Sequence, residues 1–577
     1  MKQPYEVFAD QAFVKIFRMT PEVVTVMGLS KLPQFRGLGG ELNDYSPQGQ
    51  QRRQTLLAEV HAEHCTYEFD RLSVAEQLSY EVFEFFLQYL PFEPWAGLAG
   101  DDFRAYNYPV SHHDGAPAET FNLLVNFHDV HSEEDADNYL LRLAVLPKMF
   151  TDLEDSLRRS QEQGLSPPRS ALDIIITEMR ALIDGGVLES ELLSSFRAKL
   201  YSADTFSNEQ RDHYVARAHN FVEQLYRISL PGFLAAMEAL YELAGEVLGV
   251  SRFHRGQEYY QYCLTRQSST NFTADEVYKI GKTEVDRLKF ELAKEVEALG
   301  YDRENLTDSI TKCLHLESEE CDDSTDRRQE ILQYYQQLVA DMRTKIRPYF
   351  NLFPMGACEV KATPRHLEPG RTSTYYPASV TGEYPGIFEV NLSREFSKAA
   401  WSRNNLAYHE VYPGHHLQIT LAQELEHLPL FRRTFVNGGY LEGWAKYAER
   451  LPFETDVDPD PRYELNRKAT ELLSASNLML DVGIHLRGWS REDAVAFSME
   501  QALVDRAMAE YLVDRISVTP AQVTAYILGL ITVRRERDRA KERMGERFSL
   551  VAFHDAILGE GALPLSVMER QLKKSLN

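Results

Sequence analysis

Apolar residues recur every three or four positions along most of this chain of 577 residues, which is the spacing of amphipathic helices. In one segment Thr273 and Glu276 form a capping box, and Gly300 can end the helix in a left-handed conformation. The apolar positions between them are Val277, Ile280, Val285, Leu288, Leu292, Val296 and Leu299. Similar patterns cover residues 135–260, 325–345, 460–485 and 491–512. The patterning predicts a mainly α-helical protein.

Residues 372–392 interrupt this helical pattern. Aromatic and β-branched residues are bounded there by prolines and glycines, a composition that is typical of a small sheet. Within it, Ile387–Leu392 is the candidate for an edge strand that pairs with an extended substrate. A structural hairpin packed against a helix explains the same residues equally well.

The length of the chain and its 44% hydrophobic content allow a large buried core, and the length suggests two or three lobes or domains. No repeat of fixed period and no long low-complexity linker divides the chain. We expect a soft boundary near residues 265–272, between an N-terminal helical half (1–270) and a half that holds the chemical motifs (271–577). One continuous domain is the alternative.

The chain carries 62 Lys and Arg against 87 Asp and Glu, which gives a net charge of −25. This balance disfavours nucleic acid and anionic membranes as partners, because phosphate binding requires clustered cations. The basic residues of 534–539 are interleaved with acids, as on a solvated helix face. The longest apolar run, Val523–Val533, is too short to span a bilayer.

The amino-terminal residues 1–6 contain neither an apolar signal region nor a cysteine for lipid attachment, so we expect a cytoplasmic protein. The cysteines are scattered and include no Cys-x-x-Cys pair, which argues against a disulfide framework and against a cysteine metal site. They are Cys65, Cys263, Cys313, Cys321 and Cys358.

Candidate chemistry is concentrated around residue 410. The chain places His409, Glu410, His415 and His416 within eight residues, and Glu442 follows. A zinc hydrolase needs neutral imidazoles and a carboxylate as ligands, and a second carboxylate that can take a proton from metal-bound water. These residue types therefore point to a zinc site.

Their spacing departs from the usual His-Glu-x-x-His, because Pro413 stands where the second histidine would be. On a regular helix His409 and His415 would lie about 9 Å apart along the axis and about 120° apart around it, too far to share one ion. Pro413 and Gly414 allow a bulge that returns His415 to the ligand position. We therefore predict an interrupted helix between Tyr412 and His415. A helix–turn junction whose histidines only cap or pack is the alternative.

This segment, His409-Glu410-x-x-Pro413-Gly414-His415-His416, resembles part of a large, mostly bacterial family known as domain of unknown function 885 and regarded as metallopeptidase-like. The later block Glu442-Gly443-Trp444-Ala445-x-Tyr447-Ala448-Glu449 fits the same family pattern. Further fitting blocks, spread over nearly the whole chain, are residues 20–29, 385–392, 481–485, 525–529, 553–555 and 563–565. The resemblance implies a mainly α, zincin-like peptidase fold with a small β element beside the metal-binding helix. It also implies zinc as the cofactor, whereas the family's substrates are largely unknown.

The residues can then be given roles. We predict that His409, His415 and Glu442 are the zinc ligands and that Glu410 is the general base on zinc-bound water. Glu449 either orients a ligand histidine or forms a surface salt bridge. The adjacent His416 is an alternative ligand, a substrate contact or a donor to a backbone carbonyl.

A developing oxyanion needs a hydrogen-bond donor besides the metal. Tyr526 and His485 are the preferred candidates, because each lies in a block that matches the family pattern. Tyr376 and Arg403 are the other candidates.

The leading hypothesis is a zinc-dependent, metallopeptidase-like hydrolase that cleaves short peptides. A metal-dependent amidase with a non-peptide substrate would use the same ligands. A metal-free binding or scaffold protein with a degenerate site is the third reading. The expected ligand is a peptide or small amide, and the sequence does not define the oligomeric state.

Overall fold

A computed structural model describes residues 3–88, 108–113, 115–314, 324–363, 365, 368, 372–395 and 403–576. The chain divides into two compact units. The N-terminal unit comprises Met1–Tyr259 with Ser517–Thr519, and the C-terminal unit comprises Tyr260–Ile516 with Pro520–Asn577. The division falls within helix α11 (Gly256–Ser268), shortly before the predicted boundary. Both units are mainly helical, which confirms the prediction from the patterning.

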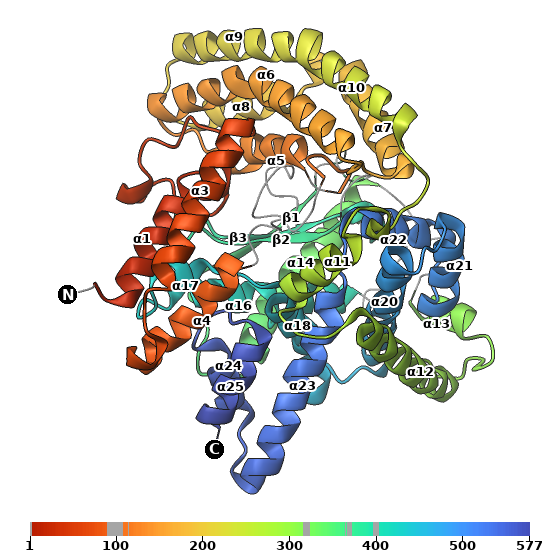
Figure 1. Ribbon diagram of the computed structural model, residues 1–577. Helices are drawn as coiled ribbons and strands as arrows, with labels where there is room; N and C mark the ends of the chain where they lie inside the picture. The colour runs from red at the N-terminus through yellow and green to blue at the C-terminus, as the bar shows by residue number, and fades with distance from the viewer. Residues whose placement is uncertain are drawn as a thin grey trace. The chain divides into compact units, whose positions relative to one another are not determined.

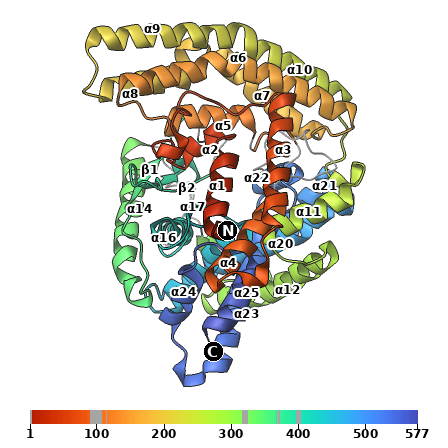
Figure 2. The ribbon, with the colours of Figure 1, turned by 60° about the vertical axis from the view of Figure 1, so that its left-hand side comes forward.

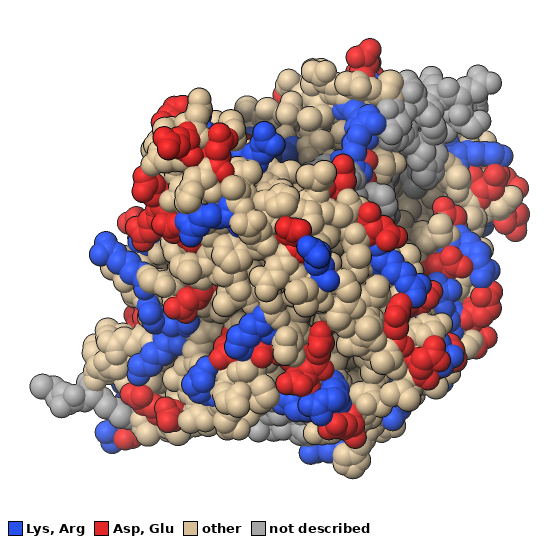
Figure 3. All heavy atoms as spheres, turned by 90° about the horizontal axis from the view of Figure 1, so that it is seen from above, with Lys and Arg blue, Asp and Glu red and all other residues tan. Residues whose placement is uncertain are grey.

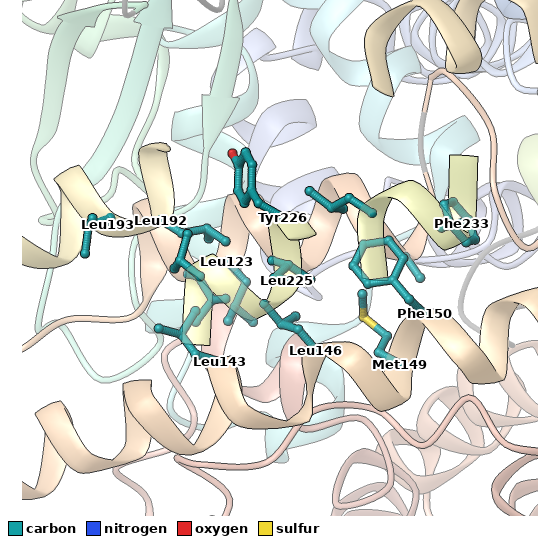
Figure 4. Close-up of a cluster of buried hydrophobic side chains, with 14 of the residues drawn as sticks. Leu123, Leu143, Leu146, Met149, Phe150, Leu192, Leu193, Leu225, Tyr226 and Phe233 are labelled. Atoms are coloured by element: carbon teal, nitrogen blue, oxygen red, sulfur yellow. The ribbon is translucent and has the colours of Figure 1, made fainter. Parts of the chain in front are cut away.

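The N-terminal unit has a hydrophobic core of its own. Its longest helix, α6, packs against α9 and α10, and α10 packs against α7 (Figure 1). The helices are α1 (Tyr5–Phe17), α2 (Pro21–Val26), α3 (Pro47–His64), α4 (Val74–Gln88), α5 (Ala116–Asn122), α6 (Glu133–Glu162), α7 (Arg169–Gly185), α8 (Glu191–Ser202), α9 (Asn208–Gln224) and α10 (Leu230–Leu243). Buried apolar side chains fill the space between them, among them Leu123, Leu143, Leu146, Met149, Phe150, Leu192, Leu225 and Phe233 (Figure 4).

The C-terminal unit carries the motif residues around residues 410 and 442. Its helices are α12 (Ala274–Ala298), α13 (Leu306–Leu314), α14 (Thr325–Lys345), α15 (Asn404–Glu410), α16 (His415–Glu424), α17 (Leu430–Thr434), α18 (Gly438–Ala448), α19 (Leu451–Glu454), α20 (Pro461–Leu486), α21 (Arg491–Ala502), α22 (Arg506–Val518), α23 (Thr524–Met544), α24 (Leu550–Leu558) and α25 (Leu565–Ser575). The capping box of Thr273 and Glu276 opens α12, and Gly300 follows its end with a φ of +88°. The pattern at 491–512 corresponds to two helices, because Leu503 turns left-handed after α21.

A small sheet confirms the predicted β element in residues 372–392 and adds a strand before it. The strand order is β1 (Cys358–Ala362), β3 (Gly386–Val390), β2 (Thr374–Tyr376). β3 pairs in parallel with β1 and antiparallel with β2. The prediction of an edge strand at Ile387–Leu392 is therefore wrong, because β1 covers the side of β3 that faces away from β2. Helix α14 packs against β1 (Figure 2).

Helices α18 and α23 approach each other closely because glycines face each other across their contact. A Cβ atom added at Gly443 would lie 2.5 Å from the Cα of Gly529. One added at Gly529 would lie 2.1 Å from the carbonyl oxygen of Gly439. This contact sets the distance between Glu442 on α18 and Tyr526 on α23.

A buried carboxyl group joins α20 to the start of α23. Asp481 is fully buried and accepts hydrogen bonds from the backbone N–H of Ala521 at 3.0 Å and from the hydroxyl of Tyr260 at 2.5 Å. Burial raises the pKa of Asp481 to about 7, although both hydrogen bonds oppose the shift. The protonated carboxyl is therefore favoured in the folded state more than in the unfolded chain.

Acidic and basic side chains are interleaved on the face of the molecule drawn in Figure 3. In the basic stretch of α23, Arg537 pairs with Glu454 at 2.6 Å. None of the described helices has both the length and the apolar character that crossing a membrane requires. Among the described cysteines no disulfide is present, and Cys321 lies outside the described residues.

The α18–α23 contact predicts that Gly443→Ala destabilises the protein. The new methyl group must push the helices apart, and overpacking of this kind costs about 1–3 kcal/mol. The measurement is the free energy of unfolding in denaturant. Gly245→Ala is the control, because a Cβ at Gly245 meets no atom within 4 Å. Equal stability of the Gly443→Ala variant and the wild type would contradict the contact.

The raised pKa of Asp481 predicts that the contribution of this residue to stability depends on pH. Its folded pKa of about 7 is raised above the unfolded value of about 3.9, so the contribution is complete at low pH and is lost as pH rises towards 7. The melting temperature of the wild type relative to Asp481→Asn should therefore fall between pH 5 and pH 8. If the difference in melting temperature between the wild type and Asp481→Asn is constant or grows with pH, the carboxyl of Asp481 is already ionised at pH 5.

Candidate metal centre

The helix that carries His409 is broken in the predicted place. Helix α15 ends at Glu410 and α16 begins at His415. Between them Val411 has φ −120° and ψ −85°, and Gly414 has φ −81° and ψ −131°. The prediction of an interruption between Tyr412 and His415 is confirmed, and the regular helix that would separate the histidines is absent here.

Two contacts account for this bend. A Cβ atom at Gly414 would lie 1.8 Å from the carbonyl oxygen of His409, so only glycine allows the chain to fold back this tightly. The indole N–H of Trp444 donates to the carbonyl oxygen of Pro413 at 2.9 Å. Trp444 is fully buried in α18, two residues after Glu442. The same helix therefore anchors the bend and carries the third candidate ligand.

The bend brings His409, His415 and Glu442 together. Glu442 Oε2 lies 3.5 Å from His409 Nε2 and 3.5 Å from His415 Nε2, and the three atoms all lie within 4.8 Å of one another. Ligands on a tetrahedral zinc ion with bonds of 2.0–2.1 Å stand about 3.3 Å apart. The separations thus suit a shared ion better than direct hydrogen bonds, which are normally 2.7–3.2 Å long.

The chemistry of the group also fits a cation. Glu442 Oε2 is buried and makes no hydrogen bond with the described residues. Burial alone would favour neutral imidazole, but the carboxylates of Glu442 and Glu449 raise the pKa of His409 to about 10. Burial likewise opposes ionisation of Glu442, yet the two histidines keep its pKa below the usual range. The surroundings therefore favour positive charge at the point where the three side chains meet.

His416 points away from this group. Its Nδ1 lies 2.9 Å from the hydroxyl of Tyr375, and its Nε2 lies 3.2 Å from the carbonyl oxygen of Gly356. Burial lowers the pKa of His416 to about 4, which keeps the ring neutral. Of the two adjacent histidines, His415 is the one that faces Glu442, and His416 ties α16 to β2.

Glu449 contacts the candidate ligand His409 at Nδ1, the ring nitrogen that does not approach Glu442. Its Oε1 accepts a hydrogen bond from His409 Nδ1 at 2.7 Å, and Lys446 Nζ lies 2.9 Å from the same oxygen. The Glu449 side chain is 1% exposed, so the surface salt bridge is excluded. A carboxylate in this position fixes the orientation and tautomer of a ligating histidine.

Glu410 stands beside the three converging residues. Its Oε2 accepts a hydrogen bond from the backbone N–H of Tyr375 in edge strand β2, at 3.1 Å. Burial raises the pKa of Glu410, while His409 and His415 act in the opposite direction. A buried carboxylate with a raised pKa next to a candidate cation site is suited to accept and return a proton.

A cavity of about 370 Å³ opens beside His409 and Glu410. Tyr526 lines it, with its ring 6.4 Å from the His409 ring and inclined by 19°. Burial and the charge of Glu442 raise the pKa of Tyr526 to about 12, so its hydroxyl keeps the proton. The other lining residues are Asn405, Leu406, Lys446, Glu449, Asn466, Thr470, Leu473, Ser474, Asn477, Leu512, Arg515 and Val523.

The other predicted oxyanion donors lie elsewhere. His485 is fully buried near the end of α20, and its Nε2 contacts the carbonyl oxygen of Ile516 at 2.8 Å. Arg403 donates to the carbonyl oxygen of Glu395 at 2.8 Å. His485, Arg403 and Tyr376 are not among the described residues that line the cavity. Of the four candidates, the structure brings Tyr526 to the site.

Several cavity residues were missed by the sequence analysis. Asn466, Thr470, Leu473 and Asn477 form one stripe of α20, because they follow one another at intervals of three or four residues. A stripe with three polar residues on a largely buried helix is a detectable signal, but it does not show which cavity the stripe faces. Arg515 on α22 belongs to no distinctive motif.

Comparison with known proteins places the chain in a family without assigning an activity. The structure is similar to that of a "putative lipoprotein" from Colwellia psychrerythraea, with a TM-score of 0.93, 24% identity and coverage of 99% of this chain and 98% of that one. A "putative lipoprotein of unknown function" from Shewanella oneidensis gives a TM-score of 0.70 at 18% identity, covering 99% of both chains. These likenesses show a shared fold alone. No curated protein matches the chain. Residues 21–572 match the family of bacterial proteins of unknown function DUF885, and the chain belongs to that family.

Proposed function

We propose that this protein is a zinc-dependent hydrolase with a zincin-like peptidase fold that cleaves short peptides. The observation that carries the proposal is the convergence of His409, His415 and Glu442 next to a buried Glu410, at the wall of a cavity. Two imidazoles and one carboxylate are the ligand set of a catalytic zinc site with an open position. A buried non-ligand carboxylate beside such a set favours a hydrolase over a scaffold protein.

His409, His415 and Glu442 would hold the zinc ion, with Glu449 orienting His409. When bound, zinc lowers the pKa of a water molecule and polarises the carbonyl group of the substrate. Glu410 takes a proton from the attacking water as the new C–O bond forms. It then delivers that proton to the leaving nitrogen as the C–N bond breaks, so that one water is consumed for each amide cleaved.

Tyr526 supplies a hydrogen bond to the oxygen that becomes negatively charged. The raised pKa keeps the hydroxyl protonated across the neutral range, as a donor must be. Such donors stabilise the transition state more than the ground state when they are already in position. The packing of α23 on α18 holds Tyr526 in place relative to Glu442.

The proposal includes a cytoplasmic location and a peptide or small amide as the ligand. An amidase with a non-peptide substrate would use the same residues, and digestion of a peptide library with a chelator control separates the two activities.

Metal binding is the first test. The wild-type protein should bind about one zinc per chain, and His409→Ala, His415→Ala and Glu442→Ala should each abolish stoichiometric binding, because each removes a ligand. Zinc content is measured by mass spectrometry after dialysis against trace zinc. His427→Ala is the matched control, since His427 is exposed in the segment after α16.

His416→Ala separates the two adjacent histidines. It should keep its zinc, because His416 contacts Tyr375 and Gly356. Loss of zinc in this folded variant, with retention in His415→Ala, would reverse the assignment. Full zinc content in both His409→Ala and Glu442→Ala would refute the site.

The role of Glu410 is tested with Glu410→Gln. The amide keeps the shape of the side chain but cannot accept the proton, so turnover of an identified peptide should fall about 10²–10⁴-fold. Zinc content should stay at the wild-type level. Near-normal turnover would show that another group is the base.

A further inference from the structure

The neighbours of Asn405 fix the orientation of its side-chain amide in the cavity. Asn405 precedes His409 by four residues on α15, and both residues line the cavity. The hydroxyl of Thr470 on α20 donates its one proton to the carbonyl oxygen of Arg467 at 2.9 Å. Thr470 Oγ1 therefore accepts a hydrogen bond from Asn405 Nδ2, at 3.2 Å. This arrangement leaves Asn405 Oδ1 as a buried acceptor that makes no hydrogen bond with the described residues.

Two further side chains on the cavity side of α20 offer oxygen acceptors. The hydroxyl of Ser474 donates to the carbonyl oxygen of Thr470 at 3.0 Å, so towards a ligand it can only accept. Asn477 follows three residues later, and its Oδ1 is buried without a hydrogen bond from the described part of the chain. Asn405 and Asn477 are only 6% and 7% exposed, and both line the cavity. This part of the lining is therefore uncharged and rich in acceptors.

Unpaired acceptors at this depth call for a donor on the ligand, because a buried polar atom without a partner is destabilising. The carboxylates of the lining already have partners of their own. Glu449 is compensated by Lys446 at 2.9 Å, and Glu410 accepts a hydrogen bond from the backbone N–H of Tyr375. An uncharged N–H group therefore suits the amide oxygens better than an ammonium group, whose burial requires an anion of its own.

Four aliphatic side chains also line the cavity. They are Leu406, Leu473, Leu512 and Val523. Leu512 and Val523 are 4% and 2% exposed, so they form a deep part of the wall. An apolar wall with a few fixed polar groups is typical of a site in which the polar groups orient the ligand. The ligand that fits carries an aliphatic side chain next to its N–H donors.

We propose that Asn405 and Asn477 accept hydrogen bonds from main-chain N–H groups of a short peptide with an aliphatic side chain. This inference rests on the proposed function for the reaction, but the acceptor site itself does not require the metal. It defines the substrate as a peptide whose bound amide nitrogens carry a hydrogen, which excludes proline and ester linkages at those positions. The volume of about 370 Å³ holds a few residues rather than a long chain.

The test uses N-acetylleucine N-methylamide, which has two main-chain N–H groups, and its two ester analogues. Each ester replaces one N–H by oxygen, which removes a donor without adding bulk. Binding to the metal-free wild-type protein is measured by ligand-observed NMR titration, so that zinc cannot itself hold a carbonyl oxygen. At least one ester should bind about 5- to 100-fold more weakly than the diamide, because a buried acceptor loses its donor. Equal binding of all three compounds, or no detectable binding of the diamide, would overturn the proposal.

Variants of the two asparagines locate the effect. Leucine has nearly the shape of asparagine but no acceptor, so Asn405→Leu or Asn477→Leu should weaken diamide binding and bring the affected ester to about equal affinity. Asn220→Leu is the control, because Asn220 is exposed on α9. A preference for the diamide that persists in both folded variants would overturn the proposal. The comparison of ligands on the wild type decides if a variant does not fold.

Leucine N-methylamide, which has a free amino group, distinguishes the two kinds of N–H donor. It should bind no more tightly than the acetylated diamide. Tighter binding of the free amine would show that the acceptors hold an ammonium group, which would overturn the proposal. Because every arm uses metal-free protein, a dependence on N–H groups without any hydrolysis would support the acceptor site while refuting the proposed function.

Discussion

The tight return of the chain after Glu410 is the constraint on which the site depends. His415 follows His409 by six positions, and a continuous helix would point their rings in different directions. The backbone instead folds back until Gly414 nearly touches the carbonyl oxygen of His409, an approach that any side chain at 414 would block. Trp444 holds this bend to α18 through Pro413, so Glu442 on that helix is fixed relative to both histidines.

Electrostatics explains why so many charged groups can be buried around this bend. Glu410 and Glu449 are buried and Glu442 is only 14% exposed, and three such carboxylates close together without cations would be strongly destabilising. Lys446 compensates Glu449, and the triad offers a position for a further cation. In the proposed enzyme the carboxylate of Glu449 therefore has two roles, because it orients His409 while being held by Lys446.

Much of this arrangement could be predicted from the sequence, since it follows from local rules. The capping box at Thr273 begins α12, and the Pro413-Gly414 pair breaks the helix where predicted. Long-range relations could not be predicted in the same way. Ile387–Leu392 has the composition of an edge strand, but β1 (Cys358–Ala362) pairs with it, and the sequence of β1 does not show which strand it joins. His485 lies in a block that fits the family pattern, yet its ring is buried against the carbonyl oxygen of Ile516. Arg515 reaches the cavity through the packing of α22, and no sequence motif indicates how that helix packs.

The most direct measurement is the position of the metal itself. Crystals of the zinc-loaded protein, with data collected on both sides of the zinc absorption edge, would locate the ion by its anomalous scattering. The account predicts one peak about 2.0–2.2 Å from His409 Nε2, His415 Nε2 and a carboxylate oxygen of Glu442. A peak at His416, or no peak near Glu442 in protein that retains stoichiometric zinc, would contradict it.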